Sequence, residues 1–122
     1  MQKKIAIIGC GASGMMAAIK AAEKGAKVIV YEHNKPGKKI LSTGNGKCNL
    51  TNLHMNASCF FSNNQEKLDL FLQKFDEKDT ITFFENSGLL LKNKNGYIYP
   101  YCEQASVVLQ ILRNLLKHSL QS

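Results

Sequence analysis

A glycine-rich turn close to the N-terminus constrains the fold more than any other feature of the sequence. The stretch KKIAIIGCGASGMMAA contains the spacing Gly9-x-Gly11-x-x-Gly14. Before it, the Ile-rich run 4–8 predicts a buried parallel strand, and after it the small and apolar residues 13–24 predict a buried helix. A second β-branched run, 27–32, predicts another strand. This order of elements predicts a βαβ unit with parallel strands.

The three glycines have separate physical uses in a nucleotide-binding turn. Gly9 permits the tight turn, Gly11 lets a pyrophosphate approach the backbone, and Gly14 lets the helix pack close to the strand. The anion would meet free N–H groups at the positive end of the helix dipole, and Ser13 adds a hydroxyl donor. The motif alone is weak, but its place between a strand and a helix predicts a dinucleotide site.

An acidic residue at the end of the second predicted strand completes the pattern. The carboxylate of Glu32 can accept hydrogen bonds from ribose hydroxyls, and its charge would repel a 2′-phosphate. NADP is therefore disfavoured at this site, whereas FAD and NAD both fit. The position of the motif at the very N-terminus favours FAD.

A long segment without periodicity follows, from 33 to 64. It is rich in Asn, Gly, Ser and Thr, and a loop of this length in a compact domain is usually functional or disordered. It carries a cluster of basic residues, Lys35, Lys38, Lys39 and Lys47. Lysine charge and loop N–H groups suit an anion, so we interpret the segment as a cofactor loop; the alternative is a solvated surface loop.

The remaining sequence predicts an α/β fold with extra helices and a small hairpin. Apolar spacing predicts helices over 65–75 and 78–86, and an amphipathic helix over 103–118. An Asn-Gly pair within 88–100 predicts the hairpin turn. Two parallel strands do not make a stable sheet, so we expect 1–122 to be the N-terminal part of a larger Rossmann-type domain; the alternative is a complete small α/β domain. An uncovered sheet edge predicts self-association.

Charge and cysteine usage exclude several other classes. The net charge is +7, which indicates either an anionic partner or a solvated basic surface. The chain has no arginine-rich arm and no zinc-finger spacing, so no nucleic acid is expected as a partner. The apolar run Ile5–Ile8 is too short for a signal peptide or a membrane span. The four cysteines form no C-x-x-C pair and the three histidines show no ligand spacing, so we expect no metal and a reducing, cytoplasmic setting.

Three stretches together carry a resemblance to a known family. They are IIGCGASGMMAA, GKKILSTGNGKCNLTN and GYIYP. Over essentially the whole chain, the sequence resembles the aminoacetone-oxidase-like flavoproteins, which include BaiN-type proteins and belong to the glutathione-reductase-type FAD-binding oxidoreductases. The resemblance implies a longer chain in which an inserted domain splits the FAD-binding Rossmann domain. Asn45 and Lys47 depart from the family pattern, where a Gly and an Arg are usual, and Lys47 lacks the bidentate fork of arginine.

The resemblance also implies roles for individual residues. The pyrophosphate of FAD would be held by Gly9, Gly11, Ala12, Ser13 and Gly14. Glu32 would bind the adenosine ribose, and Lys38 and Lys39 would lie near the phosphates or the adenosine half. The middle and the flavin end of FAD would run past Thr43, Gly44, Gly46, Lys47, Cys48 and Asn49.

These observations support a flavin-dependent oxidoreductase acting on a small-molecule substrate, with this chain as its FAD-binding portion. No residue here is identified as a catalytic acid or base, and the chain alone is expected to be inactive. One alternative is a stand-alone module that binds NAD or FAD without catalysis, and another is a basic domain associated with nucleic acid. Cys48 could act as a thiolate beside Lys47, but a packing or flavin-lining role is favoured.

Overall fold

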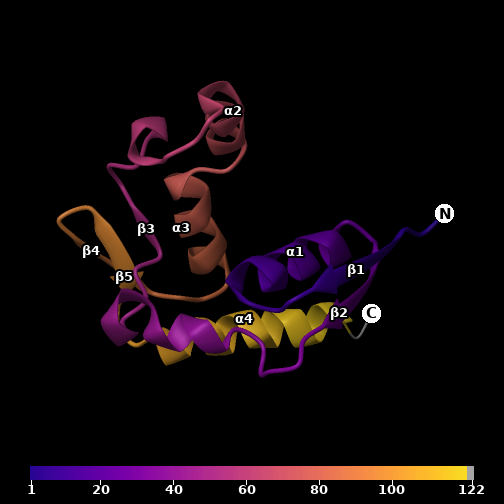
Figure 1. Cartoon of the computed structure of the whole chain (residues 1–122). Helices are drawn as coiled ribbons and strands as arrows, with labels where there is room; N and C mark the ends of the chain where they lie inside the picture. The colour runs from indigo at the N-terminus through magenta and orange to yellow at the C-terminus, as the bar shows by residue number, and fades with distance from the viewer. Residues whose placement is uncertain (121–122) are drawn as a thin grey trace. The chain divides into compact units, whose positions relative to one another are not determined.

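The computed structural model of the protein describes residues 1–120 and divides them into two compact units. The first unit contains Met1–Cys48 and the C-terminal segment from Gln104. The second unit contains Asn49–Glu103. Figure 1 labels the helices and strands of both, and each unit is described by itself below.

The first unit is built on the predicted βαβ arrangement. Strand β1 (Lys4–Ile8) is followed by helix α1 (Ala12–Glu23) and strand β2 (Lys27–Tyr31). The two strands pair in parallel, from Lys4 opposite Lys27 to Ile8 opposite Tyr31. This confirms the α/β fold class. Two further elements complete the unit: the 3-10 segment η1 (Lys38–Gly46) and helix α4 (Ala105–Leu120).

The predicted close packing at Gly14 is present. A Cβ built on Gly14 would lie 2.2 Å from the carbonyl oxygen of Gly9, far inside van der Waals contact. At the other end of α1, Gly25 has a φ of +90° and donates its N–H to the carbonyl of Ala22 at 3.0 Å. Glycine adopts this left-handed conformation without steric cost, so Gly25 ends the helix.

The core of the first unit lies where α4 packs against α1 and η1. Its buried side chains come from all three elements: Met15, Ala18, Ile19, Ile40, Val108, Leu109, Leu112 and Leu116. The spacing of these positions on α4 confirms the amphipathic helix. Val107, Ile111 and Leu115 on the same helix are half-buried.

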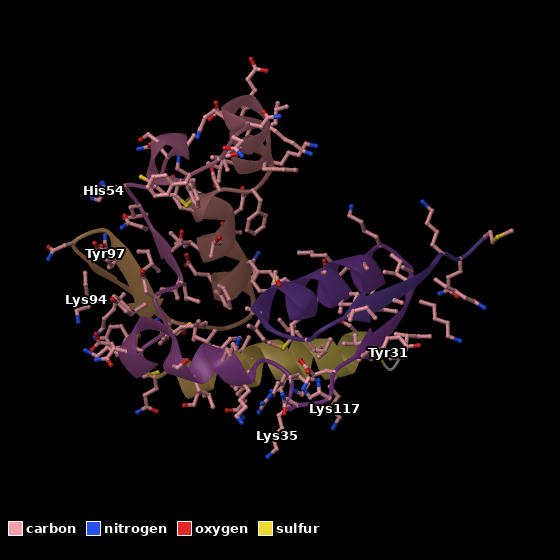
Figure 2. The ribbon with its side chains drawn as sticks, viewed as in Figure 1. Tyr31, Lys35, His54, Lys94, Tyr97 and Lys117 are labelled. Atoms are coloured by element: carbon pink, nitrogen blue, oxygen red, sulfur yellow. The ribbon has the colours of Figure 1, made fainter. Side chains whose placement is uncertain are left out.

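The prediction that the strand over 4–8 is buried was wrong for one face of the sheet, and the same face of the second strand is exposed too. Ile8, Ile29 and Tyr31 are 81%, 46% and 55% exposed. Figure 2 marks Tyr31 at the end of β2. Side chains alternate across a strand, so α1 covers the face that carries Ile7, and the opposite face stays open among the described residues. Self-association through this sheet remains a prediction.

The second unit combines a small antiparallel sheet with helices. It contains the following elements in chain order: β3 (Thr51–Asn52), η2 (Ala57–Cys59), α2 (Gln65–Lys74), α3 (Glu77–Asn86), β4 (Leu91–Lys94) and β5 (Tyr97–Pro100). The strand order is β3-β5-β4. Both predicted helices and the hairpin are confirmed, whereas the two-residue strand β3 was not predicted.

Local sequence explains the elements of the second unit. The Asn64 side chain accepts a hydrogen bond from the N–H of Lys67 at the start of α2, and Asp76 forms a capping box with Asp79 at the start of α3. At the hairpin turn, Asn95 and Gly96 both have positive φ, as a two-residue hairpin loop requires. Figure 2 marks Lys94 and Tyr97, which flank this turn.

Among residues 1–120, no helix is both long enough and apolar enough to cross a membrane.

Gly14→Ala should destabilise the protein by about 3 kcal/mol, because the added methyl group must displace the backbone at Gly9. Gly11→Ala is the matched control. A Cβ at Gly11 meets nothing within 4 Å, and the residue has an ordinary negative φ, so its effect should stay within about 1 kcal/mol. Urea unfolding followed by circular dichroism measures both. Equal destabilisation by the two variants would contradict the packing role of Gly14.

Candidate functional site

The glycine turn joins the end of β1 to the start of α1 and leaves open space at its tip. Gly9 has a φ of +88° and donates its N–H to the carbonyl of Tyr31 at 2.8 Å, which ties the turn to the end of β2. Gly11 is the N-cap residue of α1, where no side chain caps the helix and the first turn carries no acidic residue. The first N–H groups of a helix have no acceptor within the helix. A negatively charged ligand at Gly11 would therefore meet unshielded donors and the positive end of the helix dipole.

The carboxylate of Glu32 accepts two backbone hydrogen bonds, one of which comes from this turn. Its Oε1 accepts from the N–H of Cys10 at 2.9 Å, and its Oε2 accepts from the N–H of Asn34 at 3.2 Å. The bond from Cys10 is the largest cause that lowers the pKa of Glu32, followed by the bond from Asn34. Glu32 is therefore ionised at neutral pH. Each carboxylate oxygen retains a lone pair that a sugar hydroxyl can use.

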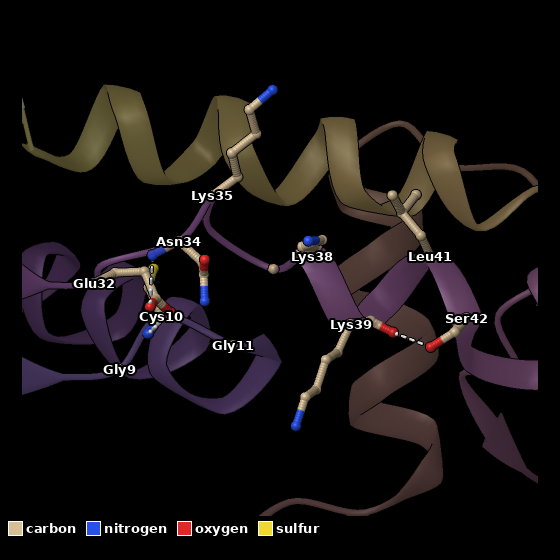
Figure 3. A pocket seen from close by; sticks show the side chains of 11 residues that line it. Gly9, Cys10, Gly11, Glu32, Asn34, Lys35, Lys38, Lys39, Leu41 and Ser42 are labelled. Carbon is tan, nitrogen blue, oxygen red and sulfur yellow. Dashed lines mark hydrogen bonds between the residues drawn. The ribbon is translucent and has the colours of Figure 1, made fainter.

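A groove of about 710 Å³ runs between the glycine turn and the segment that follows β2. Figure 3 shows Gly9, Cys10 and Glu32 on one side and Lys38, Lys39 and Ser42 on the other. The hydroxyl of Ser42 donates to the carbonyl of Lys39 at 2.9 Å, which closes the first turn of η1. The lining residues are Gly9, Cys10, Gly11, Glu32, Asn34, Lys35, Gly37, Lys38, Lys39, Leu41 and Ser42. One wall thus carries backbone donors and a carboxylate, and the other carries lysines.

The groove brings together five of the residues that the sequence predicted for the site: Gly9, Gly11, Glu32, Lys38 and Lys39. Ala12, Ser13 and Gly14 follow in the first turn of α1, adjacent to the groove but not in its lining. Lys35, from the basic cluster of the predicted cofactor loop, lines the groove as well, and the predictions missed Cys10, Asn34, Gly37, Leu41 and Ser42. Their signal in the sequence was only their position beside predicted residues.

The segment from Thr43 to Cys48 forms backbone hydrogen bonds within itself and does not line the groove. The N–H of Lys47 donates to the carbonyl of Gly44 at 3.1 Å, and the N–H of Cys48 donates to the carbonyl of Thr43 at 3.0 Å. Four of its residues have left-handed backbone, with φ of +54° at Gly44, +56° at Asn45, +85° at Gly46 and +62° at Cys48. Asn is among the residues that tolerate this region best, so Asn45 can adopt its positive φ at little cost. The Lys47 side chain is exposed.

Both buried thiols of the first unit are protonated at neutral pH. Burial raises the pKa of Cys48, and a hydrogen bond with the Thr43 side chain offsets this only in part. Burial also raises the pKa of Cys10, with a further contribution from the charge of Glu32. The structure therefore favours a packing role for Cys48 over a reactive thiolate.

Asn49 is the first residue of the second unit, and its side chain fastens the small sheet. Its Nδ2 donates to the carbonyl of Thr51 at 3.0 Å and to the carbonyl of Ile98 at 3.1 Å. Its contact with a cofactor remains a prediction.

Residues 1–120 contain no group of three His, Cys, Asp or Glu side chains placed to hold a metal ion. Cys10, Cys48, Cys59 and Cys102 are all free thiols.

Comparison with known proteins gives consistent matches along the chain. A family model described as the HI0933-like protein Rossmann domain matches residues 3–121. The chain is similar to the 3-dehydro-bile acid delta(4,6)-reductase of Clostridium scindens, with 46% identity over 117 residues that cover 93% of this chain and 29% of the reductase. It is also similar to the ribosomal RNA dihydrouridine synthases of Escherichia coli (35% over 89 residues, 72% of this chain and 22% of the synthase) and Haemophilus influenzae (31% over 111 residues, 88% and 27%). The chain spans less than a third of the length of each of these relatives.

Glu32→Gln should be less stable than the wild type at neutral pH, because an ionised carboxylate is the stronger acceptor for two backbone N–H groups. The pKa of Glu32 is lower in the folded protein than in the unfolded chain. The advantage of the wild type is therefore complete above the ordinary carboxyl range and is lost as the pH falls through the lowered value. Urea midpoints of the two proteins, measured from pH 7 to about pH 3, should converge at the acid end. A gap that stays constant over this range would show that Glu32 does not act through its charge.

Proposed function

Since the chain belongs to the HI0933-like protein Rossmann domain family, we propose that it is the FAD-binding portion of a flavin-dependent oxidoreductase. The observation that carries the proposal is the pairing of Glu32 with an open glycine turn. The carboxylate is bonded to the backbone of Cys10, one residue from Gly11, and both line one groove. Side by side, these two groups would recognise the ribose and the pyrophosphate of a dinucleotide.

The residues of the groove fit the adenosine diphosphate half of FAD. A Cβ at Gly11 would project into free space, so a pyrophosphate can approach the backbone there and meet the N–H groups of Ala12 and Ser13. Glu32 would accept hydrogen bonds from the ribose hydroxyls. Lys38 and Lys39 would supply positive charge from the opposite wall. The volume of the groove lies within the usual range for small-molecule sites.

The same residues select among nucleotides. The ionised carboxylate of Glu32 would repel a 2′-phosphate, so we propose that NADP is excluded from the groove. NAD shares the adenosine diphosphate half of FAD, so it fits this groove equally well. A stand-alone module that binds NAD or FAD without catalysis is therefore the second candidate. It predicts equal affinity for the two dinucleotides.

For the flavin end, the proposal relies on the family resemblance. Thr43, Gly44, Gly46, Lys47, Cys48 and Asn49 would run past the middle of the cofactor and its isoalloxazine ring. The raised pKa of Cys48 suits a neutral packing role there and supports no thiol chemistry. The bound flavin would supply hydride transfer, while these residues bind and orient it.

The names of the relatives suggest the class of reaction. A delta(4,6)-reductase and a dihydrouridine synthase both add hydrogen to a carbon–carbon double bond that is conjugated with a carbonyl group. We propose the same class of reduction for the whole protein, on a small-molecule substrate and in a reducing, cytoplasmic setting that suits four free thiols. The described residues bind and orient the cofactor, and none of them is assigned as a catalytic acid or base.

A titration with FAD, followed by flavin fluorescence, tests the proposal. The wild type should bind FAD saturably, and NAD should displace it poorly. Gly11→Asp should weaken FAD binding at least about tenfold, because it places a negative charge beside the pyrophosphate. Gly11→Asn is the matched control of similar size without the charge, and it should weaken binding less.

Two results would contradict the proposal. A folded wild-type protein that binds no FAD would exclude the groove as a flavin site. Equal affinity for NAD and FAD would favour the stand-alone nucleotide-binding module instead.

A further inference from the structure

The peptide group between Pro36 and Gly37 bridges two distant parts of the first unit. Its carbonyl, on Pro36, accepts a hydrogen bond from Nε of Arg113 at 2.8 Å. Its N–H, on Gly37, donates to the carbonyl of Cys10 at 2.7 Å. Arg113 lies on α4, 77 residues further along the chain, and Cys10 lies in the glycine turn. One peptide group therefore connects α4 to the turn that forms the opposite wall of the groove.

Apolar side chains also pack closely around Gly37. Gly37 is buried and has a φ of +71°. A Cβ on Gly37 would lie 2.4 Å from Cε of Met15 and 2.5 Å from Cδ1 of Leu109, so α1 and α4 close over it from two sides. The segment is therefore held by close contact with two helices and by hydrogen bonds at both polar groups of one peptide.

The Pro36–Gly37 segment directly precedes the lysine wall of the groove. Lys38 and Lys39 follow Gly37 and begin η1. The N–H of Ile40 donates back to the carbonyl of Gly37 at 2.9 Å, and the buried Ile40 side chain joins the core of the unit. The direction in which η1 leaves Gly37 therefore depends on how the Pro36–Gly37 peptide is oriented.

The glycine turn has its own supports. Gly9 is bonded to Tyr31, and Cys10 is bonded to Glu32. The Pro36 carbonyl, on the lysine side of the groove, accepts its side-chain hydrogen bond from Arg113 on α4. Arg113 is the single arginine of the chain, and its half-buried, planar guanidinium gives a donor of fixed direction.

We propose that Arg113 is a positioning residue for the nucleotide site. Through the Pro36–Gly37 peptide, it sets the place of Lys38 and Lys39 relative to the glycine turn, so that the lysine wall can meet the phosphates of a dinucleotide. Side chains that act on a ligand need such support from residues behind them to hold their geometry. The inference rests on the proposed function, since it concerns the same groove.

The test compares ADP and adenosine as probes, with binding measured by calorimetry or NMR titration. In the proposed site, ADP would reach both walls of the groove, whereas adenosine would reach only the side of Glu32. Arg113→Met should weaken ADP binding about tenfold and change adenosine binding less than about twofold. Arg113→Lys keeps a donor but not its fixed direction, and it should restore part of the ADP affinity. Lys117→Met is the matched control, because it removes a charge from an exposed position of the same helix.

The outcomes separate this inference from the proposed function. A wild-type protein that binds neither probe would overturn both. A wild type that binds ADP, with a folded Arg113→Met that binds it equally well, would overturn the role of Arg113 alone. Equal weakening of ADP and adenosine, or the same loss in Lys117→Met, would also overturn it, because general loosening or loss of charge would then explain the effect.

Hydrogen exchange on the wild type gives a second measurement that does not need a variant to fold. The Gly37 amide should exchange slowly and become more protected when ADP is bound. Exchange of this amide at the rate of an open loop would overturn the proposal.

Discussion

The close approach of Gly14 to the carbonyl of Gly9 fixes the start of α1 against the end of β1, and the rest of the first unit depends on it. With the helix in this place, its first N–H groups open beside Gly11, and its buried side chains face α4. The turn also brings the backbone of Cys10 within hydrogen-bond distance of Glu32 at the end of β2. A single contact that only glycine allows thus sets the groove, the helix packing and the environment of the carboxylate.

Features encoded within a few residues of the chain could be predicted from sequence. The βαβ unit, the turn at Asn95 and Gly96, and the capped helices α2 and α3 all follow from local patterns. In the site, the same is true of Gly9, Gly11 and Glu32, because a βαβ unit brings the ends of its parallel strands together.

Features that depend on distant contacts could not be predicted in this way. The apolar residues of 4–8 predict a buried strand, but the sequence does not show which face of the sheet is covered. Ile8 is in fact largely exposed. The burial of Leu109 could not be predicted either, because packing decides which side of α4 faces α1 and η1. Arg113 carried no local signal at all, since its partner lies 77 residues away.

The order of the two units along the chain has a consequence for synthesis on the ribosome. The second unit is one continuous segment, whereas the first unit is discontinuous and needs the helix that follows it. Contacts between distant segments form only after both have been made. Residues 49–103 can therefore complete their fold first, while the glycine turn and its lysine wall wait for α4 to emerge. The nascent chain thus acquires this groove late, although all the residues that line it lie within 9–42 and are made early.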